Sequence, residues 1–312
     1  MRVGFVVLNY QNHTATISCV DSLVTQLASC PDVSGHSWKI AVLDNSSPNN
    51  SWAALVAWLG CADPAWRANI ILLRNEANLG YGGGNNVGLR TLFDKEDCDI
   101  VFVVNSDVIT KHVAFETLES VASESKPTCL GVMLQETGGP NEAVVGGAYF
   151  RAPWFHSSRP ATVNNTARGL FYVSGAFFGF NRALFAVTGG FNESHFLYFE
   201  ELDLFFRVRE VVGNWPAVKI LRKWRAFHSV GGSTGNAPSG AHKSQLSEYY
   251  SARARILFAR RHLLPLLANA IAYNVLLCVD RAVRGRRRQL WGIVAGTVHG
   301  ILGRTGETLS VH

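Results

Sequence analysis

The 312-residue chain has few charged side chains and no cysteine pair at the spacing of a metal site. Only 17% of its residues are charged and 47% are apolar, which excludes a disordered chain and predicts a large buried core. Its six cysteines contain no CxxC pair, which argues against a zinc knuckle and against a disulfide scaffold. These absences favour one large domain, or one and a half, in a reducing cytoplasm.

The chain also lacks signals for export and for repeats. Its N-terminus, MRVGFVVLNY, enters an apolar run directly and has no cleavage pattern of a signal peptide, so we expect no export. The formal charge is +6, and RAVRGRRR (281–288) places five arginines in eight residues. A solvated basic face or an anionic membrane surface fits this cluster. Nucleic acid is disfavoured, because no aromatic residues alternate with the arginines.

Unbroken apolar runs recur in the first third of the chain, and each is followed by polar residues or glycine. Runs that are apolar on both faces are typical of buried parallel strands. Segments with a helical pattern lie between them, which predicts a doubly wound α/β sheet. Ligands bind beyond the carboxyl ends of such strands. The runs are residues 3–8, 40–43, 70–73 and 100–104, and the segments that follow them begin at Asn9, Asp44, the glycine-rich stretch and Asn105.

The second half begins with less regular strands and ends in a helical tail. We expect a helix in FEELDLFFRVREVV, a pair of strands in KILRKWRAFH, and helices from Ser244 to about Leu302. A boundary near Gly240 would separate a mixed core (1–240) from a basic helical extension (241–312). The most apolar stretch of the extension, LLPLLANAIAYNVLLCV, is short for a bilayer span and is interrupted by proline and asparagine. It predicts a packed or membrane-lying helix.

Four glycines lie within five residues of NLGYGGGNNVG, at positions 80 and 82–84. The stretch lacks the Walker lysine and the GxGxxG spacing, so the common phosphate-loop motifs are disfavoured. Two interpretations remain open. The glycines form a tight turn that enters a helix, or their amides bind a diphosphate together with Asn85 and Asn86 at a helix N-terminus.

Several polar residues allow both a structural and a functional interpretation. Asp107 in VVNSDV follows the fourth predicted strand and either caps a turn or, beside a diphosphate, binds a divalent cation. Asp44 in LDNSS either caps the next helix or accepts a hydrogen bond from a nucleobase or ribose. His228 precedes the glycine-rich SVGGSTG and is either structural or a metal ligand beside a lid.

The densest acidic cluster is FLYFEELDLFFR. On a helix, Glu200 and Asp203 would share a face whereas Glu201 would point elsewhere. One interpretation is a solvated helix start that pairs with Arg207 or Arg209. The surrounding aromatics favour the other, a half-buried setting that raises a carboxyl pKa and suits a general base.

Seven motifs follow one another along residues 3 to 235: VVLNYQN, LDNSSPNNS, NLGYGGGNNVG, VVNSDV, VSGAFFGFNRALFAVTGGFNE, FLYFEELDLFFRV and FHSVGGST. In this order they resemble the family 2 glycosyltransferases of GT-A fold, particularly the bacterial rhamnosyltransferase-like branch. EYYSARARILFARR and HGILGRTG are similar to the helical ends of those enzymes. The resemblance implies a Rossmann-like, doubly wound mixed sheet with a nucleotide-sugar half (about 1–110), an acceptor half (about 111–240) and a C-terminal helical extension.

The resemblance also implies where the donor lies. Asn9, Asp44 and Asn45 would contact the nucleoside. The glycine-rich stretch would hold a nucleotide-diphosphate sugar through Gly80, Gly83 and Asn86.

The metal and the catalytic base follow from the same resemblance. Asn105 to Asp107 occupies the place of the DxD motif, with Asn105 in place of the first acid, so Asp107 would bind Mg²⁺ or Mn²⁺ with His228 beside it. Glu200 and Glu201 match the family's Glu-Asp pair, whose second acid is the usual base, and Glu201 therefore becomes the predicted base. Asp203 completes the predicted catalytic group by supporting the acceptor site or the helix.

The implied reaction is an inverting sugar transfer, in which a carboxylate takes the proton of an acceptor hydroxyl while a cation and backbone amides stabilise the leaving diphosphate. We expect a deoxyhexose, such as rhamnose from a dTDP- or UDP-sugar, to move to a lipid-linked or polysaccharide acceptor. The arginine cluster predicts a peripheral enzyme on the anionic cytoplasmic membrane face, and an oligomer is compatible with the sequence. The alternatives are a nucleotidyltransferase and a non-catalytic sugar-nucleotide-binding or scaffolding subunit.

Overall fold

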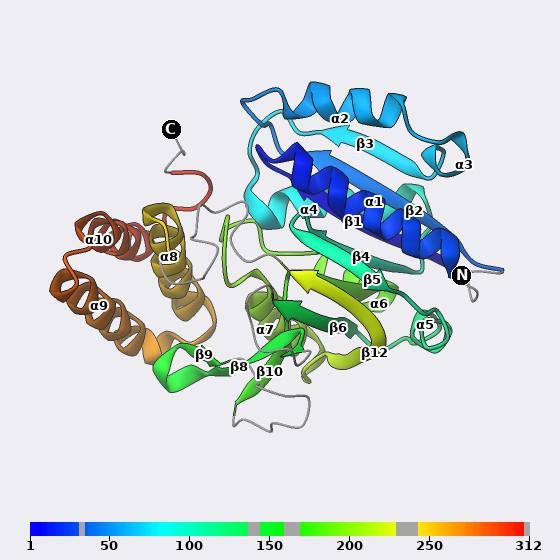
Figure 1. Ribbon diagram of the computed structural model, residues 1–312. Coiled ribbons are helices and arrows are strands. Elements are labelled where there is room, and N and C mark those ends of the chain that lie inside the picture. The colour runs from blue at the N-terminus through cyan, green and yellow to red at the C-terminus, as the bar shows by residue number, and fades with distance from the viewer. Residues whose placement is uncertain (31–34, 137–143, 159–168, 229–242, 309–312) are drawn as a thin grey trace.

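A nine-stranded mixed sheet runs through the centre of the protein (Figure 1). The structure, a computed structural model, describes residues 1–30, 35–136, 144–158, 169–228 and 243–308. The strands of this sheet are β1 (Arg2–Asn9), β2 (Ser37–Asp44), β3 (Ile70–Arg74), β4 (Ile100–Asn105), β5 (Val108–His112), β6 (Thr128–Glu136), β7 (Val144–Val145), β11 (Phe177–Asn181) and β12 (Ala217–His228). Their order is β3-β2-β1-β4-β11-β6-β12-β5, and β7 pairs with β6.

The predicted apolar runs form the parallel half of the sheet. β1 pairs in parallel with β2 and β4, and β2 pairs in parallel with β3. In β1, Val3 and Phe5 pack on α1 (His13–Ser29), whereas Val6 packs with Leu89 of α4 (Gly80–Arg90). Both faces of the strands are therefore covered by helices, and this explains why the runs are apolar throughout. The other helices of this region are α2 (Ser51–Gly60), α3 (Pro64–Arg67), η2 (Thr91–Lys95), α5 (Leu118–Ala122), α6 (Arg182–Thr188) and α7 (Glu200–Val212).

The prediction of two strands in KILRKWRAFH is wrong, because this segment lies within the single strand β12. β12 pairs in parallel with β6 and antiparallel with β5. Its register against β6 shifts between Leu221 and Arg225. Trp224 lies in this irregular stretch with 1% of its surface exposed and donates its indole N–H to Ala114 O at 2.6 Å. A bulge thus turns a tryptophan into the core without ending the strand.

The glycine-rich stretch is helical, because α4 begins at Gly80 rather than at the asparagines. A Cβ atom at Gly84 would lie 2.7 Å from Leu8 Cδ1, and one at Gly88 would lie 2.5 Å from Val6 Cγ1. Gly80 has φ +71°, and a Cβ there would overlap the Phe196 carbonyl oxygen. The glycines therefore allow α4 to lie directly on β1 and to start against the chain at Phe196. This close packing outweighs the low helix propensity of glycine.

The predicted helical tail is confirmed, and it packs onto the core. Ile256 and Phe258 of its first helix share a hydrophobic cluster with Phe150 and Leu202. The predicted boundary near Gly240 and the loop after His228 lie outside the described residues. The tail consists of α8 (Gln245–His262), η4 (Leu264–Leu266), α9 (Leu267–Val283) and α10 (Arg287–Ile301), and the small sheet beside it consists of β8 (Gly147–Arg151), β9 (His156–Ser158) and β10 (Leu170–Val173), with η3 (Ala152–Trp154) between β8 and β9.

Candidate active site

The predicted nucleoside residues at the ends of β1 and β2 are buried and bonded to each other. The Asn9 amide donates to Asp44 Oδ1 at 2.7 Å and to Ser47 Oγ at 3.2 Å, and Asn9 Oδ1 accepts from Thr16 Oγ1 at 2.8 Å. Asp44 Oδ2 accepts from the Ser47 backbone amide at 3.1 Å. The structure thus brings Asn9 and Asp44 together as a brace between the two loops. Their contact with a nucleoside stays a prediction.

Asn45 fixes the segment that leads into α4. Its amide donates to Asn78 Oδ1 at 2.8 Å and to Gly80 O at 3.1 Å, while its Oδ1 accepts from the Asn75 amide at 2.9 Å and from the Leu79 backbone at 3.1 Å. Both ends of this side chain are therefore engaged inside the protein. Any role in donor binding would act through the placement of the helix start.

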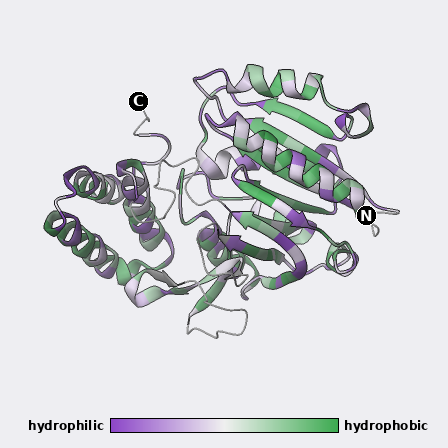
Figure 2. Ribbon diagram, in the orientation of Figure 1, coloured by the Kyte–Doolittle hydropathy of each residue, from purple (hydrophilic) through white to green (hydrophobic). Residues whose placement is uncertain are grey.

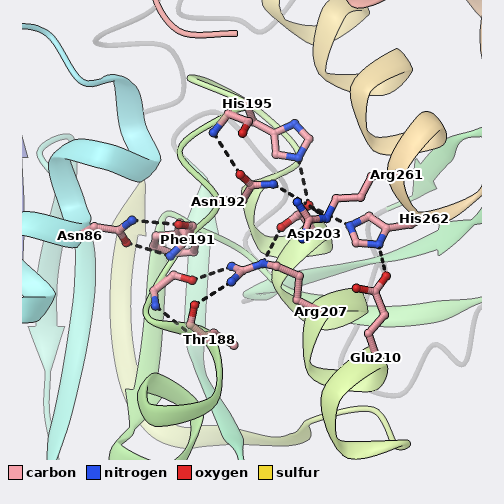
Figure 3. Close-up of polar contacts among 12 residues, drawn as sticks. Asn86, Thr188, Phe191, Asn192, His195, Asp203, Arg207, Glu210, Arg261 and His262 are labelled. Atoms are coloured by element: carbon pink, nitrogen blue, oxygen red, sulfur yellow. Dashed lines mark hydrogen bonds and ion pairs between the residues drawn. The ribbon is translucent and has the colours of Figure 1, made fainter. Parts of the chain in front are cut away.

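Asn86 connects α4 to the segment after α6. Its amide donates to Phe191 O at 2.8 Å and its Oδ1 accepts from the Phe191 backbone at 2.8 Å (Figure 3). The same amide also donates to Glu193 Oε1 at 3.0 Å. Gly83 lies on the same side, where an added Cβ would be 3.7 Å from Glu193 Oε2. The predicted donor residues of α4 therefore form a structural joint. Their contact with the donor is untested.

The two predicted metal ligands lie together. His228 Nε2 is 3.4 Å from Asp107 Oδ1, and both side chains are largely buried. The β5–β12 register places His228 opposite Val108, directly beside Asp107. Asn105 ends β4 before them, and its backbone amide donates to Ala176 O at 3.0 Å. Among the described residues no group of three or more His, Cys, Asp or Glu side chains could hold a metal ion.

A carboxylate and an imidazole at one point fit a divalent cation that takes its remaining ligands from a diphosphate and water. The donor set of Asp107 and His228 is thus compatible with Mg²⁺ or Mn²⁺ only if the substrate completes the coordination.

An unusual backbone presents the acids of α7. Phe196, Tyr198 and Phe199 have φ values of +68°, +73° and +71°, in the left-handed region that bulky residues seldom adopt. Each such residue costs of the order of 1–3 kcal/mol and persists only where its surroundings hold it. Phe196 stacks on Tyr250 at 4.8 Å, and Phe199 packs on Phe258 at 5.3 Å, both on α8. Helix α8 therefore supports the turn from which α7 starts.

Glu200 and Glu201 begin α7 in an environment that favours their neutral forms. Glu200 is 2% exposed, and burial, followed by the charge of Glu201, raises its pKa well above the usual value. Burial also raises the pKa of Glu201, against hydrogen bonds from the backbone amides of Glu201 and Gly175. A Cβ at Gly175 would overlap Glu201 Oε1, so any larger residue there would displace the Glu201 carboxylate from this position. The predicted half-buried acid pair matches this arrangement.

Tyr81 lies beside Glu201 at Gly175, and the sequence interpretation missed it. Its hydroxyl donates to Gly175 O at 2.7 Å. Burial and then the charges of Glu201, Glu200 and Asp107 raise its pKa. Its phenol is therefore close to carboxylates that are far apart in the sequence. The signal was present, since Tyr81 is the one large residue within the run of glycines.

Asp203 lies in a different place from the other two acids. Its Oδ1 is 3.2 Å from His195 Nε2 and 2.8 Å from His262 Nε2, and accepts from the Asn192 amide at 3.1 Å, while its Oδ2 accepts from Arg207 at 2.8 Å (Figure 3). Burial alone would raise the pKa of Asp203, but these hydrogen bonds and positive charges hold it well below the usual range. The ion pair with Arg207 that the sequence allowed is present. With both oxygens engaged and no exposed surface, Asp203 joins α7 to α8 rather than facing Tyr81.

The fold places the protein among the GT-A glycosyltransferases. The structure superposes with a TM-score of 0.56 on GalNAc-T7 with UDP, GalNAc and Mn²⁺, at 13% identity over 83% of this chain and 48% of that one, so this chain spans about half of it. It superposes at 0.53 on the mannosyltransferase PcManGT of Pyrobaculum calidifontis in complex with GDP-Man and Mn²⁺, at 12% identity over 96% and 87% of the chains. The predicted GT-A fold is thereby confirmed.

Comparison of the amino-acid sequence with known families identifies the family of this chain. Residues 5–189, more than half of the chain, match Glycosyl transferase family 2, and the chain belongs to this family. It is 27% identical to an N-acetylglucosaminyl-diphospho-decaprenol L-rhamnosyltransferase of Mycobacterium tuberculosis, over 73% of this chain and 81% of the relative. It is 26% identical to the low-salt glycan biosynthesis hexosyltransferase Agl10 of Haloferax volcanii, over 55% and 53% of the chains.

Proposed function

We propose that this glycosyltransferase moves rhamnose, with inversion, from a nucleotide-diphosphate donor to a hydroxyl of a lipid-linked or polysaccharide acceptor. The observation that carries the proposal is the position of the Tyr81 hydroxyl, which donates to Gly175 O at 2.7 Å beside Glu201 Oε1. Burial and then the negative charges of Glu201, Glu200 and Asp107 raise the pKa of this phenol. A base and a cation ligand around one residue suit a reaction in which a hydroxyl loses a proton while a diphosphate leaves.

Glu201 acts as the base in this proposal. It takes the proton of the acceptor hydroxyl as the hydroxyl oxygen attacks the anomeric carbon, on the face opposite the nucleotide. Glu200 is the more deeply buried acid, and the charge of Glu201 adds to its raised pKa. Two adjacent buried carboxylates do not ionise together easily, so Glu200 keeps its proton and Glu201 carries the negative charge.

Asp107 and His228 would hold Mg²⁺ or Mn²⁺ on the donor side. When bound, the cation supplies positive charge to the leaving diphosphate. The Mn²⁺ in the two GT-A structures supports a divalent cation.

The similarity to the M. tuberculosis relative supports rhamnose as the transferred sugar and a lipid-linked acceptor. Its name specifies an L-rhamnosyl group and a diphosphate-linked decaprenol, so rhamnose and a lipid-linked acceptor are the first pair to test. A lipid-linked acceptor would bring the enzyme to a membrane surface, and the cytoplasmic face is the one that this proposal assigns. Either dTDP or UDP would suit the predicted nucleoside pocket.

The test compares Glu201→Gln with wild-type protein and with the control Glu119→Gln, whose side chain is 68% exposed on α5. A panel of nucleotide sugars is bound in a calorimeter with and without Mn²⁺, and transfer to lipid-linked acceptors is followed in parallel. We expect Glu201→Gln to lower the transfer rate by about 10²- to 10⁴-fold with unchanged donor affinity, and Glu119→Gln to behave as wild type.

Three results would count against this function. Equal loss of donor affinity and transfer would assign Glu201 to structure. Donor binding without donor consumption by the wild-type protein would favour a non-catalytic sugar-nucleotide-binding subunit. Release of pyrophosphate from a nucleoside triphosphate and a sugar phosphate would identify a nucleotidyltransferase.

A further inference from the structure

The outward face of α9 is apolar, which is the reverse of an ordinary surface helix. Val275, Leu276, Val279 and Val283 are 54%, 67%, 55% and 83% exposed. Ala268 and Ala272 are exposed on the same side, so the outward positions recur at the three- and four-residue spacing of one helix face. Figure 2 shows the apolar colouring along α9 at the edge of the molecule.

The inward face of α9 carries the polar side chains. Asn274 is buried and donates to Ala252 O at 3.2 Å and to Thr297 Oγ1 at 2.8 Å, and its Oδ1 accepts from the buried Arg255. Arg281 donates to Glu248 Oε1 at 2.7 Å. These bonds tie the middle and the C-terminal part of α9 to α8 and α10.

Helix α9 therefore lies on the enzyme and does not cross a membrane in this fold. Residues 264–283 are long and apolar enough for a span by length and composition alone. A span would expose Asn274 and the Arg281–Glu248 pair to hydrocarbon, which is unfavourable for polar groups without partners.

Arginines surround the end of this apolar face. Residues 281–288 contain five arginines, and Asp280, just before them, pairs with Arg281 and Arg284. Arg287 and Arg288 are exposed at the start of α10, next to Trp291, which is 64% exposed. Apolar side chains beside arginines and a tryptophan match the chemistry of an anionic bilayer interface.

We propose that the outward face of α9 and the segment from Arg284 to Trp291, which comprises the α9–α10 connection and the start of α10, dock in the plane of an anionic lipid bilayer. The apolar side chains enter the acyl boundary, and the arginines contact the lipid phosphates. This proposal rests on the proposed function only in supplying a reason for membrane contact, namely access to a lipid-linked acceptor.

The experiment floats the full-length protein with vesicles of phosphatidylcholine, with or without phosphatidylglycerol. Leu276→Glu/Val279→Glu removes the apolar contact, and Arg287→Ala/Arg288→Ala removes two charges from an exposed turn. Val211→Glu is the matched control, since Val211 is 69% exposed on α7, outside the docking face. We expect wild type and Val211→Glu to float with phosphatidylglycerol vesicles, and both double variants to lose at least about tenfold in partitioning.

Circular dichroism checks that each variant is folded, and the arginine variant keeps the test decisive if the glutamate variant unfolds. Wild-type protein that stays with the non-floating fraction, or double variants that float as well as wild type, would overturn the proposal. Light scattering that detects a dimer dissociated by Leu276→Glu/Val279→Glu, without flotation, would assign the face to a second copy of the chain. Glu201→Gln should float as wild type, so failure of catalysis and failure of docking are distinguishable.

Discussion

Replacing Asp203 by asparagine tests whether the buried ion network joins the catalytic helix to the C-terminal helices. Asp203 is fully buried and is contacted by His195, His262 and Arg207. Asparagine keeps the volume but removes the charge, and it leaves Arg207 without its anion, whereas His262 keeps its contact with Glu210 Oε1 at 2.6 Å. Loss of one partner of a buried ion pair costs about 3–5 kcal/mol of unfolding free energy. This is a large part of the roughly 5–15 kcal/mol available to a domain.

Urea unfolding followed by tryptophan fluorescence at neutral pH measures this cost. The control is Asp97→Asn, which breaks an exposed pair with Arg182, since Asp97 is 90% exposed. Such surface pairs contribute about 0–1 kcal/mol, so the control should unfold close to wild type. A loss below about 1 kcal/mol in Asp203→Asn would refute the idea that the network holds the two helices together.

The pH dependence of stability gives a second check on Asp203. Its pKa is depressed in the folded protein, so its contribution is present above the unfolded pKa of about 3.9 and is lost as pH falls toward the folded pKa. Wild-type stability should therefore fall faster than that of Asp203→Asn below about pH 4. If the unfolding free energies of wild type and Asp203→Asn change in parallel with pH over this range, the pKa of Asp203 is not depressed in the folded protein.

Two glycine substitutions test the packing of the site. Gly175→Ala places a Cβ on Glu201 Oε1 and would displace this carboxylate. We expect the transfer rate to fall by about 10²-fold, as for misplacement of a catalytic group, with the Tm little changed. Full activity in a transfer assay would show that Glu201 is not held there. Gly88→Ala brings a Cβ to 2.5 Å from Val6 Cγ1 and should lower the unfolding free energy by about 1–3 kcal/mol through overpacking; unchanged urea unfolding would show that α4 can move away from β1.

Much of the fold could be predicted because local pattern and tertiary environment agree. The central strands β1 and β4 are buried on both faces, and their sequences are almost entirely apolar. The start of α4 could not be predicted in the same way. Helix propensity argues against four glycines in the first five residues of a helix. The approach of Phe196 to Gly80 and of Leu8 to Gly84 explains two of them. The sequence also did not show that β12 is one continuous strand. The buried Trp224 at its irregular stretch bonds to Ala114, which is 110 residues away in the sequence.

Some residues of the candidate site could be predicted from the sequence, and others could not. The family resemblance implied that Asp107 and His228 lie together, and the register between β5 and β12 brings them to 3.4 Å. The network around Asp203 includes His262, which is 59 residues away in the sequence. No local sequence pattern predicts a partner at that separation. Tyr81 was visible in the sequence, but its neighbours Gly175 and Glu201 come from two other segments. Roles that depend on partners from distant segments require the structure.

Helix α8 links the acid pair to the proposed membrane face. On one side its Tyr250 and Phe258 rings hold the left-handed turn before Glu200. On the other side it packs against α10, where a Cβ at Gly300 would lie 2.7 Å from Ile256 Cβ, and its Arg255 bonds to Asn274 of α9. Strained backbone is retained only where rigid surroundings hold it, so the C-terminal helices contribute to the geometry of Glu200 and Glu201. A surface that docks through α9 would therefore place a lipid-linked hydroxyl near acids that are positioned by the same helices.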